Sequence, residues 1–377
     1  MIFSTSKNKV AFAMTILGNI VNDKSPEVDS VYLLAKGGVC SFVRGNRFSR
    51  IEAIVDQTDL EFQVKIPYND MASIVKMVDA TFECRIDDKK LTIIGEGYQY
   101  EIQQEFFVDS AILSRVLEGQ GESITFHNNN FKHMFEKVCV ASANRVPPIL
   151  DSLYLHEGQA YCTHVSILSQ TQENSNDHNI EGDICVPFFI AQLACKLDDL
   201  LETEIFFGNK LVSCEFKLPD SGVPIVVADC SYLEGNYPIG QIMKTWTEVG
   251  KPNRPVSVVN KDFLKAIKKI SAVNKTGQSA VSMKTEGNQF HISQHYSEKG
   301  VDVYVDFNDI RHIDIIESFS DVSAYNDTYS IDTIKFPSQF LSKALKNMEA
   351  KVFISVFEGR YLLVYDEKVS HIIPLMS

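Results

Sequence analysis

Apolar residues recur at helical spacing in three similar segments of the chain. The clearest segment has an apolar stripe formed by Phe263, Ile267, Ile270 and Val273. Residues spaced by three and four positions share one face of a helix, so this stripe predicts an amphipathic helix over 263–273. Comparable patterns predict helices over Val10–Val21 and Phe131–Ala143.

A second set of helical patterns follows a proline. An apolar residue precedes this proline in all three cases, at Ile66-Pro67, Val186-Pro187 and Phe336-Pro337. Proline is tolerated in the first turn of a helix, where its missing N–H would have no partner anyway. Each pair therefore predicts the start of a helix.

Alternating apolar and polar residues predict strands between and after these helices. Val31–Leu34 and Val39–Val43 flank Gly37-Gly38, which is typical of a hairpin turn. A second hairpin and a closing strand follow each proline-marked helix. The closing strands are predicted at Tyr98–Ile102, Pro224–Val227 and Ser370–Leu375.

The order of these elements repeats along the chain. Asp29-Ser30-Val31-Tyr32-Leu33 recurs as Asp151-Ser152-Leu153-Tyr154-Leu155, and a weaker third copy surrounds Val281-Ser282-Met283. A repeat of this length is close to a whole domain rather than a solenoid unit. We predict three tandem α+β domains over residues 1–121, 122–250 and 251–377, each with two helices and about eight antiparallel strands.

Composition narrows the class of protein. No apolar run reaches the length of a membrane span, no signal peptide is evident, and the eight cysteines show no metal-binding spacing. We therefore expect a cytoplasmic protein with reduced thiols, no metal, no cofactor and no membrane partner.

No motif of a known catalytic site is present. The sequence lacks the glycine-rich phosphate loops, the HExxH zinc motif and the GxSxG nucleophile motif. We expect that the protein is not an enzyme. An enzyme without a linear signature and a triplicated structural or assembly protein without a DNA role remain alternatives.

Lysines gather on the predicted helices, although the formal net charge of the chain is −13. Lys265, Lys268 and Lys269 lie opposite the apolar stripe of their helix, and acidic residues are sparse on the helices. For any one helix, a solvent-exposed face is enough to explain the lysines. Because lysines recur on several of the predicted helices, the pattern favours a surface that faces phosphates.

Three local segments match one family. They are Gly235-Asn236-Tyr237-Pro238-Ile239-Gly240-Gln241-Ile242-Met243, the C-terminal His371–Ser377, and Val138–Asn144 followed by Ile149-Leu150-Asp151-Ser152. With the threefold α+β repeat, they make the chain similar to the bacterial-type DNA polymerase sliding clamp, the DNA polymerase III beta subunit family. Where many members carry T-D-G-H-R-L, this chain has Thr163-His164-Val165-Ser166-Ile167-Leu168. The loss of the Gly-His-Arg centre indicates a divergent clamp, such as one carried by a phage, with an altered peptide preference.

The resemblance implies a ring-shaped head-to-tail homodimer that encircles duplex DNA without sequence preference. It also implies a polymerase and a clamp loader as partners, bound through short peptides. The residues expected to face DNA are Lys24, Lys132, Lys137, Arg145, Lys265, Lys268, Lys269 and Lys343. Tyr100, Ile102 and Val273 are expected at the dimer interface. The partner-peptide pocket is expected to be lined by Leu150, Thr163, Leu168, Tyr237, Pro238, Ile242, Met243, Ile372, Ile373, Pro374, Leu375 and Met376.

Overall fold

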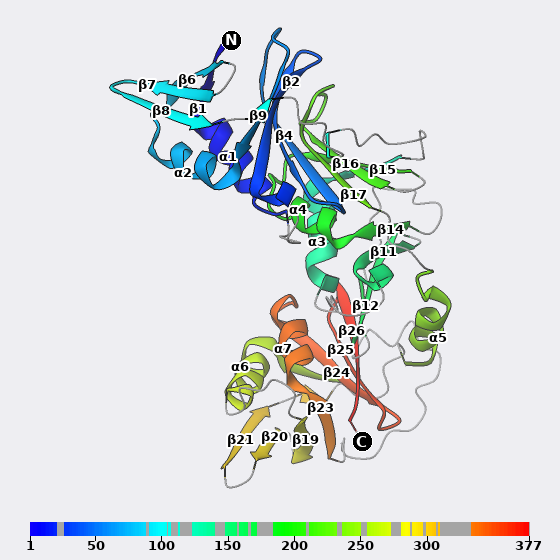
Figure 1. The fold of residues 1–377 in the computed structure, drawn as a ribbon. Coiled ribbons are helices and arrows are strands. Elements are labelled where there is room, and N and C mark those ends of the chain that lie inside the picture. The colour runs from blue at the N-terminus through cyan, green and yellow to red at the C-terminus, as the bar shows by residue number, and fades with distance from the viewer. Residues whose placement is uncertain are drawn as a thin grey trace. The chain divides into compact units, whose positions relative to one another are not determined.

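The protein consists of antiparallel sheets flanked by short helices (Figure 1). The computed structural model describes residues 1–20, 26–87, 90–103, 105–106, 112–113, 123–139, 148–156, 158–164, 167–171, 184–208, 211–231, 236–249, 255–272, 280–286, 289–296, 299–306, 308–309 and 333–376. Within these ranges, no helix has both the length and the apolar character that a membrane crossing requires.

Three repeats with the same order of elements make up the chain. The first contains β1 (Ile2–Ser6), α1 (Lys7–Leu17), β2 (Ser30–Lys36), β3 (Val39–Gly45), β4 (Ser49–Gln57), β5 (Phe62–Pro67), α2 (Tyr68–Met77), β6 (Thr81–Ile86), β7 (Lys90–Gly95) and β8 (Tyr98–Gln103). The second contains β10 (Ser123–His127), α3 (Asn128–Val138), β11 (Ser152–His156), β12 (Gln159–His164), β13 (Ile167–Thr171), β14 (Ile184–Pro187), α4 (Phe188–Ala194), β15 (Glu202–Phe207), β16 (Leu211–Lys217) and β17 (Pro224–Ser231). The third contains β18 (Val256–Val259), α6 (Asn260–Ser271), β19 (Ala280–Glu286), β20 (Gln289–Tyr296), β21 (Lys299–Asp306), β23 (Ile334–Pro337), α7 (Ser338–Lys346), β24 (Lys351–Phe357), β25 (Tyr361–Tyr365) and β26 (Val369–Pro374). The predicted threefold α+β repeat is confirmed.

Five short elements remain. They are η1 (Pro26–Asp29), β9 (Glu105–Phe106), η3 (Pro148–Leu150), α5 (Ile239–Val249) and β22 (Asn308–Asp309). The first and third of these occupy the same place in the first and second repeats, directly before β2 and β11. The sequence analysis does not predict α5, which lies between the last strand of the second repeat and the first strand of the third.

Each repeat folds into two four-stranded half-sheets. In the first repeat their strand orders are β5-β2-β3-β4 and β1-β6-β7-β8. The second repeat has β14-β11-β12-β13 and β10-β15-β16-β17, and the third has β23-β19-β20-β21 and β18-β24-β25-β26. The last strand of each half-sheet in these orders is the one available to join a neighbour.

Two junctions within the chain join half-sheets of successive repeats. Strand β4 of the first repeat pairs antiparallel with β17 of the second, and β13 of the second pairs in the same way with β26 of the third. Each junction produces a nine-stranded sheet, which short β9 or β22 completes at one edge. The remaining two half-sheets end at β8 and β21, each of which lies at an edge of its four-stranded sheet.

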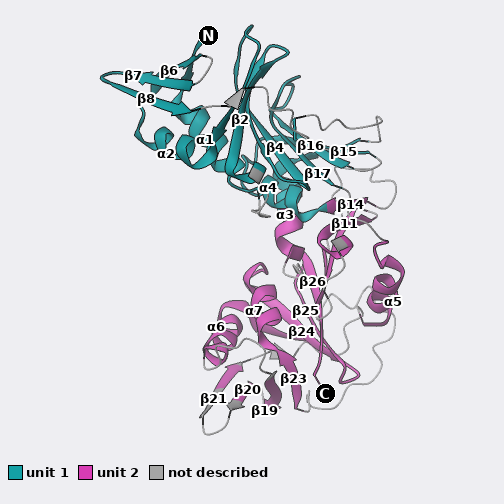
Figure 2. Ribbon diagram, viewed as in Figure 1, with its two compact units in different colours: residues 1–132, 187–233 teal, residues 133–186, 234–377 magenta. Residues whose placement is uncertain are grey.

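The two junctions explain how the chain divides into compact units (Figure 2). Unit 1 comprises residues 1–132 and 187–233, and unit 2 comprises residues 133–186 and 234–377. The second repeat thus contributes one half-sheet to each unit. The predicted boundaries of three sequential domains remain a prediction, since the compact units cut through the second repeat.

The first residue of the first helix has the same role in every repeat. The backbone N–H groups of Lys7, Asn128 and Asn260 donate to the carbonyls of Ala80, Leu201 and Ala350, at 2.9, 2.8 and 2.9 Å. The side chains of the same three residues bond the last carbonyls of the second helix or the turn after it. These carbonyls have no partner within their own helix, so a side chain from the neighbouring helix satisfies them. The contact fixes the two helices of each repeat against one another.

Candidate nucleic-acid and partner interfaces

The most cationic helix surface in the described structure lies on α6 and α7 of unit 2. The apolar stripe of α6 is buried, with Phe263, Ile267 and Ile270 in the core. On the opposite side, four lysines of α6 and two of α7 are exposed: Lys261, Lys265, Lys268, Lys269, Lys343 and Lys346. Helices α6 and α7 pack on one another (Figure 1), so these lysines are carried by two adjacent helices. Four of them are residues that the sequence analysis expected to face DNA.

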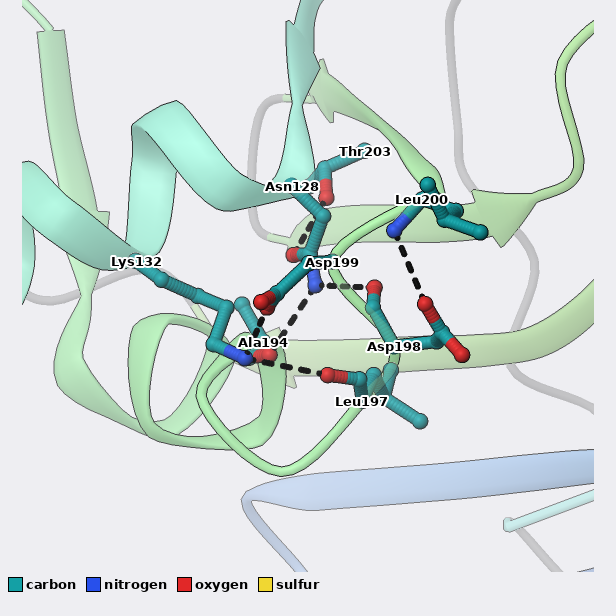
Figure 3. A network of polar contacts seen from close by, with 8 residues as sticks. All are labelled: Asn128, Lys132, Ala194, Leu197, Asp198, Asp199, Leu200 and Thr203. Carbon is teal, nitrogen blue, oxygen red and sulfur yellow. Dashed lines mark hydrogen bonds and ion pairs between the residues drawn. The ribbon is translucent and has the colours of Figure 1, made fainter.

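Lys132 has a different environment (Figure 3). Its Nζ donates to the carbonyl of Leu197 at 3.1 Å and forms an ion pair with Asp199 at 2.5 Å. Only 17% of the side chain is exposed. The charge of Lys132 is thus neutralised by a carboxylate and stabilises the turn after α4, which does not fit its predicted role as a DNA contact.

Lys137 also departs from the prediction, because only 5% of the residue is exposed. It lies near the end of α3, close enough to His371 to lower the pKa of that imidazole. A buried ammonium group is poorly placed to contact phosphate, so Lys137 is not retained among the DNA contacts. Lys24 and Arg145 lie outside the described residues.

The two open sheet edges, β8 and β21, carry aromatic residues. On β8 the rings of Tyr98 and Tyr100 lie 5.3 Å apart. On β21 Tyr304 is exposed and stacks on His291 at 4.8 Å. Tyr100 is half-buried, but Ile102 belongs to the core of its own half-sheet with 4% exposed. Ile102 therefore stabilises the fold of one chain, and a charge at this position would disrupt that core.

Val273 lies outside the described residues. The part of the dimer interface that the sequence analysis placed there has no structural description.

Several predicted pocket residues meet at the junction of β13 with β26. Leu168 pairs with Thr163 across the β12–β13 hairpin and with Ile372 across the junction. Tyr237 stacks on Tyr154 with ring centroids 4.5 Å apart and planes inclined by 7°. Leu168, Ile372, Tyr154 and Tyr237 are buried, whereas Thr163 is half-buried.

Burial raises the pKa of Tyr237 well above its usual value. Tyr237 therefore keeps its proton at neutral pH and lies against the strand that carries Thr163. Its neighbour Pro238 is half-buried and precedes α5. On α5, Ile242 is buried and Met243 is half-buried.

The C-terminal residues of the predicted pocket fall into two groups. Ile372 and Ile373 are buried in the sheet, whereas Pro374 and Leu375 are half-buried and Met376 is exposed. The N–H of Leu375 donates to the Arg360 carbonyl, and that of Met376 donates to the Lys335 carbonyl, each at 2.7 Å. The chain end is thus held by backbone hydrogen bonds. Leu150, in η3, is half-buried.

A buried histidine lies within the same junction. His371 pairs with Ser169 in register, and its Nδ1 lies 2.7 Å from the Ser169 hydroxyl. Burial and the nearby charge of Lys137 lower its pKa from 6.5 to about 3. The imidazole is therefore neutral at physiological pH and serves as a structural polar group.

The β4–β17 junction in unit 1 contains charged side chains, in place of the neutral histidine of the β13–β26 junction. Arg50 and Asp229 are register partners across β4 and β17, and Arg50 Nη1 lies 2.7 Å from Asp229 Oδ2. The same guanidinium forms an ion pair with Glu52, whose other oxygen accepts from Ser41 at 2.7 Å. All three charged side chains are largely buried.

Sequence reasoning missed the roles of two buried aromatic residues. The ring contact of Tyr154 with Tyr237 links positions far apart in the chain, which local patterns do not reveal. Trp246 on α5 is buried together with Ile242 and Val249. The spacing of these three residues is helical and was a detectable signal for α5.

No metal site emerges from the residues that the structure describes. Over these residues, no group of three or more histidine, cysteine or acidic side chains is arranged to hold a metal ion. Burial raises the pKa of the Cys40 thiol to about 12 and that of the Cys162 thiol well above its usual value. These thiols are therefore protonated and weakly nucleophilic.

Comparison of the whole chain with known proteins gives its fold. The sequence matches no family model, and no curated protein matches it. Three solved structures illustrate the structural likeness. A DNA polymerase sliding clamp from Bacillus subtilis has a TM-score of 0.79 at 18% identity, covering 100% of this chain and 99% of that one.

A DNA polymerase sliding clamp from Caulobacter crescentus has a TM-score of 0.80 at 15% identity, covering both chains fully. The DNA polymerase III beta subunit of Thermotoga maritima has a TM-score of 0.80 at 14% identity, covering 100% of this chain and 99% of that one. The protein therefore has the fold of the bacterial DNA polymerase sliding clamps, with a strongly divergent sequence.

Proposed function

We propose that this protein is a DNA sliding clamp, a processivity factor that encircles duplex DNA as a head-to-tail dimer and tethers a polymerase. The observation that carries the proposal is the pair of open edges β8 and β21. In the strand orders given above, they are the two last strands that neither junction of the described chain pairs. The fold supports the same function, because its structural neighbours are named sliding clamps.

The internal repeat indicates how these edges pair. In both junctions, the last strand of one repeat's first half-sheet joins the last strand of the next repeat's second half-sheet. By the same rule β21 of one chain pairs with β8 of a second chain. Two such intermolecular junctions close a ring of six repeats and cover four exposed edges, two from each chain, which isolated sheets otherwise leave open to aggregation.

Met77 is expected to join this contact. At the second junction, Asn347 lies directly after α7 and donates to the carbonyl of Glu136 near the end of α3, at 2.5 Å. Met77 is the corresponding residue of the first repeat, because it follows Pro67 by as many residues as Asn347 follows Pro337. Its side chain is 56% exposed. In the ring it packs against the end of α6 of the second chain, which buries an otherwise exposed apolar side chain.

The exposed lysines of α6 and α7 are the proposed DNA contacts. Lys265, Lys268 and Lys269 alternate with the buried stripe of α6, and Lys343 adds a charge from α7. Lysines provide contacts to phosphate that do not depend on sequence, which suits a protein that must slide. The net negative charge of the chain disfavours binding elsewhere on its surface.

The proposed peptide site is the surface formed by Tyr237, Leu168 and the chain end. Polymerase and clamp-loader peptides are the expected ligands. Of the predicted lining residues, those with partly or fully exposed surface are Leu150, Thr163, Pro238, Met243, Pro374, Leu375 and Met376. A few apolar anchors provide most of the affinity of such peptides.

The decisive experiment tests whether a closed ring surrounds DNA. Cysteines placed at exposed positions of β8, such as Gln99 and Glu101, are paired in turn with cysteines along β21 until one pair forms a disulfide between chains. The oxidised dimer formed on circular duplex DNA should resist denaturant and come free when the DNA is cut once. Dimers that never become linked to circular DNA would favour the alternative, an assembly protein without a DNA role.

A second experiment tests the cationic surface. Replacing Lys265, Lys268 and Lys269 with alanine should lower the slope of log affinity against log salt by about 0.9 for each lost contact. A matched variant removes three exposed cations outside the proposed contact surface, Lys36, Lys244 and Arg360. The proposal for this surface is wrong if the two triple variants change the slope equally.

A further inference from the structure

An exposed apolar cluster lies at one end of the second repeat, within unit 1. It consists of Leu200, Leu218 and Val223, which are 75%, 51% and 41% exposed, and we call it the repeat-two patch. Single exposed apolar residues are common on protein surfaces. Three large ones at the same end of a sheet require an explanation.

Strand register brings the three residues together. Leu200 precedes β15 by two positions, Leu218 follows β16 directly, and Val223 precedes β17 directly. Glu202 pairs with Lys217, which in turn pairs with Pro224, so these three strand ends lie next to one another. Neighbouring strands are about 5 Å apart, which places the patch residues within reach of one ligand.

Defined hydrogen bonds hold the loops that carry the patch. The N–H of Leu200 donates to Asp198 Oδ1 at 2.9 Å, and the Asp198 carbonyl accepts from Asn128 Nδ2 at 2.8 Å (Figure 3). In the next turn, the N–H of Ser221 donates to the Leu218 carbonyl at 3.0 Å. The apolar side chains are therefore presented by ordered turns, which lowers the entropy cost of binding.

The other two repeats serve as internal controls. The positions that correspond to Leu200, Leu218 and Val223 are Asp79, Glu96 and Gly97 in the first repeat and Glu349, Asp366 and Lys368 in the third. None of these six residues is apolar.

Polar contacts link the corresponding turns in both control repeats. Asp79 Oδ2 accepts from the N–H of Glu96 at 3.2 Å, and Asp366 Oδ2 accepts from the N–H of Glu349 at 2.7 Å. Lys368 adds an ion pair with Glu349 at 2.9 Å. The fold thus does not need apolar residues at this place, and their presence in the second repeat alone points to a ligand.

Acidic side chains surround the patch. Asp198 and Asp199 directly precede Leu200, and Asp220 lies in the turn between Leu218 and Val223. All three are exposed, and only Asp199 has a lysine partner, Lys132, within the described contacts. An apolar centre with an anionic rim complements a ligand with apolar anchors and flanking cations.

We propose that the repeat-two patch is a second docking site for a protein segment, with two or more large apolar residues flanked by lysine or arginine. This site goes beyond the proposed clamp function and is separate from the peptide surface of unit 2. The carboxylates repel both nucleic acid and anionic lipid, which leaves a basic peptide segment as the ligand that fits apolar centre and rim together.

Selection from a displayed library of short random peptides tests the proposal. The wild-type protein is the target, and the Leu200→Ser/Leu218→Ser double variant is used for counter-selection, which removes peptides bound to any other surface. Enriched peptides should contain apolar anchors and basic flanks. Their affinity should fall at least about tenfold in the double variant.

Two further variants sharpen the test. Phe48→Ser removes an exposed apolar side chain at the opposite end of β17 and should leave the affinity unchanged. The double variant Asp198→Asn/Asp220→Asn keeps the patch apolar, and it should lower the affinity for the same peptides by roughly two- to fivefold at low salt.

The proposal fails if no peptide distinguishes the wild type from the double variant, or if the enriched peptides lack basic residues. It also fails if sedimentation velocity reveals a concentration-dependent association that the double variant abolishes, since a second copy would then be the occupant.

Discussion

The side chain of Asn260 offers a direct test of how each repeat is held together. Its Nδ2 donates to the carbonyls of Leu345, Met348 and Glu349 at 2.9, 3.0 and 2.9 Å, and the residue is 7% exposed. Asn260→Ala removes the donor and keeps the helical backbone, including the N–H bond to Ala350. Carbonyls at the end of α7 and in the turn after it then lose a partner.

The expected loss of stability follows from burial. A buried polar group without a partner costs about 1–3 kcal/mol, and water can reach part of the exposed Glu349 end. Asn260 Oδ1 is itself buried without a partner in the described structure, and its removal recovers about 1 kcal/mol. With the other two carbonyls left without a partner, we therefore expect a net loss of roughly 1–5 kcal/mol in the free energy of unfolding.

The equivalent residue of the first repeat should behave differently. Lys7 Nζ donates to the carbonyls of Lys76 and Val78 at 3.1 and 2.9 Å, at a more exposed site. Water can replace the ammonium there, so Lys7→Ala should cost less than about 1 kcal/mol. Lys261→Ala, next to Asn260 and exposed, controls for helix propensity.

The assay combines urea unfolding at fixed protein concentration with hydrogen exchange. Exchange reports local opening, so peptides from the end of α7 should lose protection in Asn260→Ala and keep it in the control. If Lys7→Ala proves as costly as Asn260→Ala, or if α7 keeps its protection, the cross-helix bonds do not stabilise the repeat as inferred.

Two further predictions concern the junctions. The folded state holds His371 neutral with a pKa of about 3, whereas the unfolded chain takes up a proton near pH 6.5. Stability should therefore fall as pH drops from about 6.5 towards 3, by up to roughly 5 kcal/mol, and His371→Gln should reduce this dependence in urea titrations at several pH values. Arg50→Ala should cost about 3–5 kcal/mol, because it leaves the carboxylates of Asp229 and Glu52 buried without their cation. Arg50→Met/Asp229→Leu should be much less harmful by the same denaturation measurement, and an equally large loss would refute the electrostatic explanation.

Much of the fold could be predicted from the periodicity of apolar residues. The amphipathic patterns at 10–21, 131–143 and 263–273 correspond to α1, α3 and α6. The observed helices begin about three residues earlier than predicted, because their first turns are polar. An apolar stripe contains no residues from such polar turns and so does not predict them. The hydrogen bonds that hold these first turns join residues far apart in the chain.

The candidate site could be predicted only in part. Exposed lysines on α6 follow from local sequence, since the buried stripe defines the opposite face. The environment of Lys132 depends on Asp199, which the fold brings to it from a distant turn. The same holds for Tyr154 and Tyr237, whose stacking requires the tertiary structure. Local patterns therefore identified candidate charges but could not determine which of them are neutralised.

Two of the sheet junctions lie within one polypeptide, whereas the proposed ring junctions join two chains, and this difference affects assembly. Both β4–β17 and β13–β26 join strands of one polypeptide, so each benefits from the effective concentration that a tether imposes. In the proposed ring, β21 and β8 come from different chains and meet only at the bulk protein concentration. Dilution therefore weakens only the β21–β8 junctions. A protein that opens the ring needs to separate one β21–β8 pair, while the other junctions stay intact.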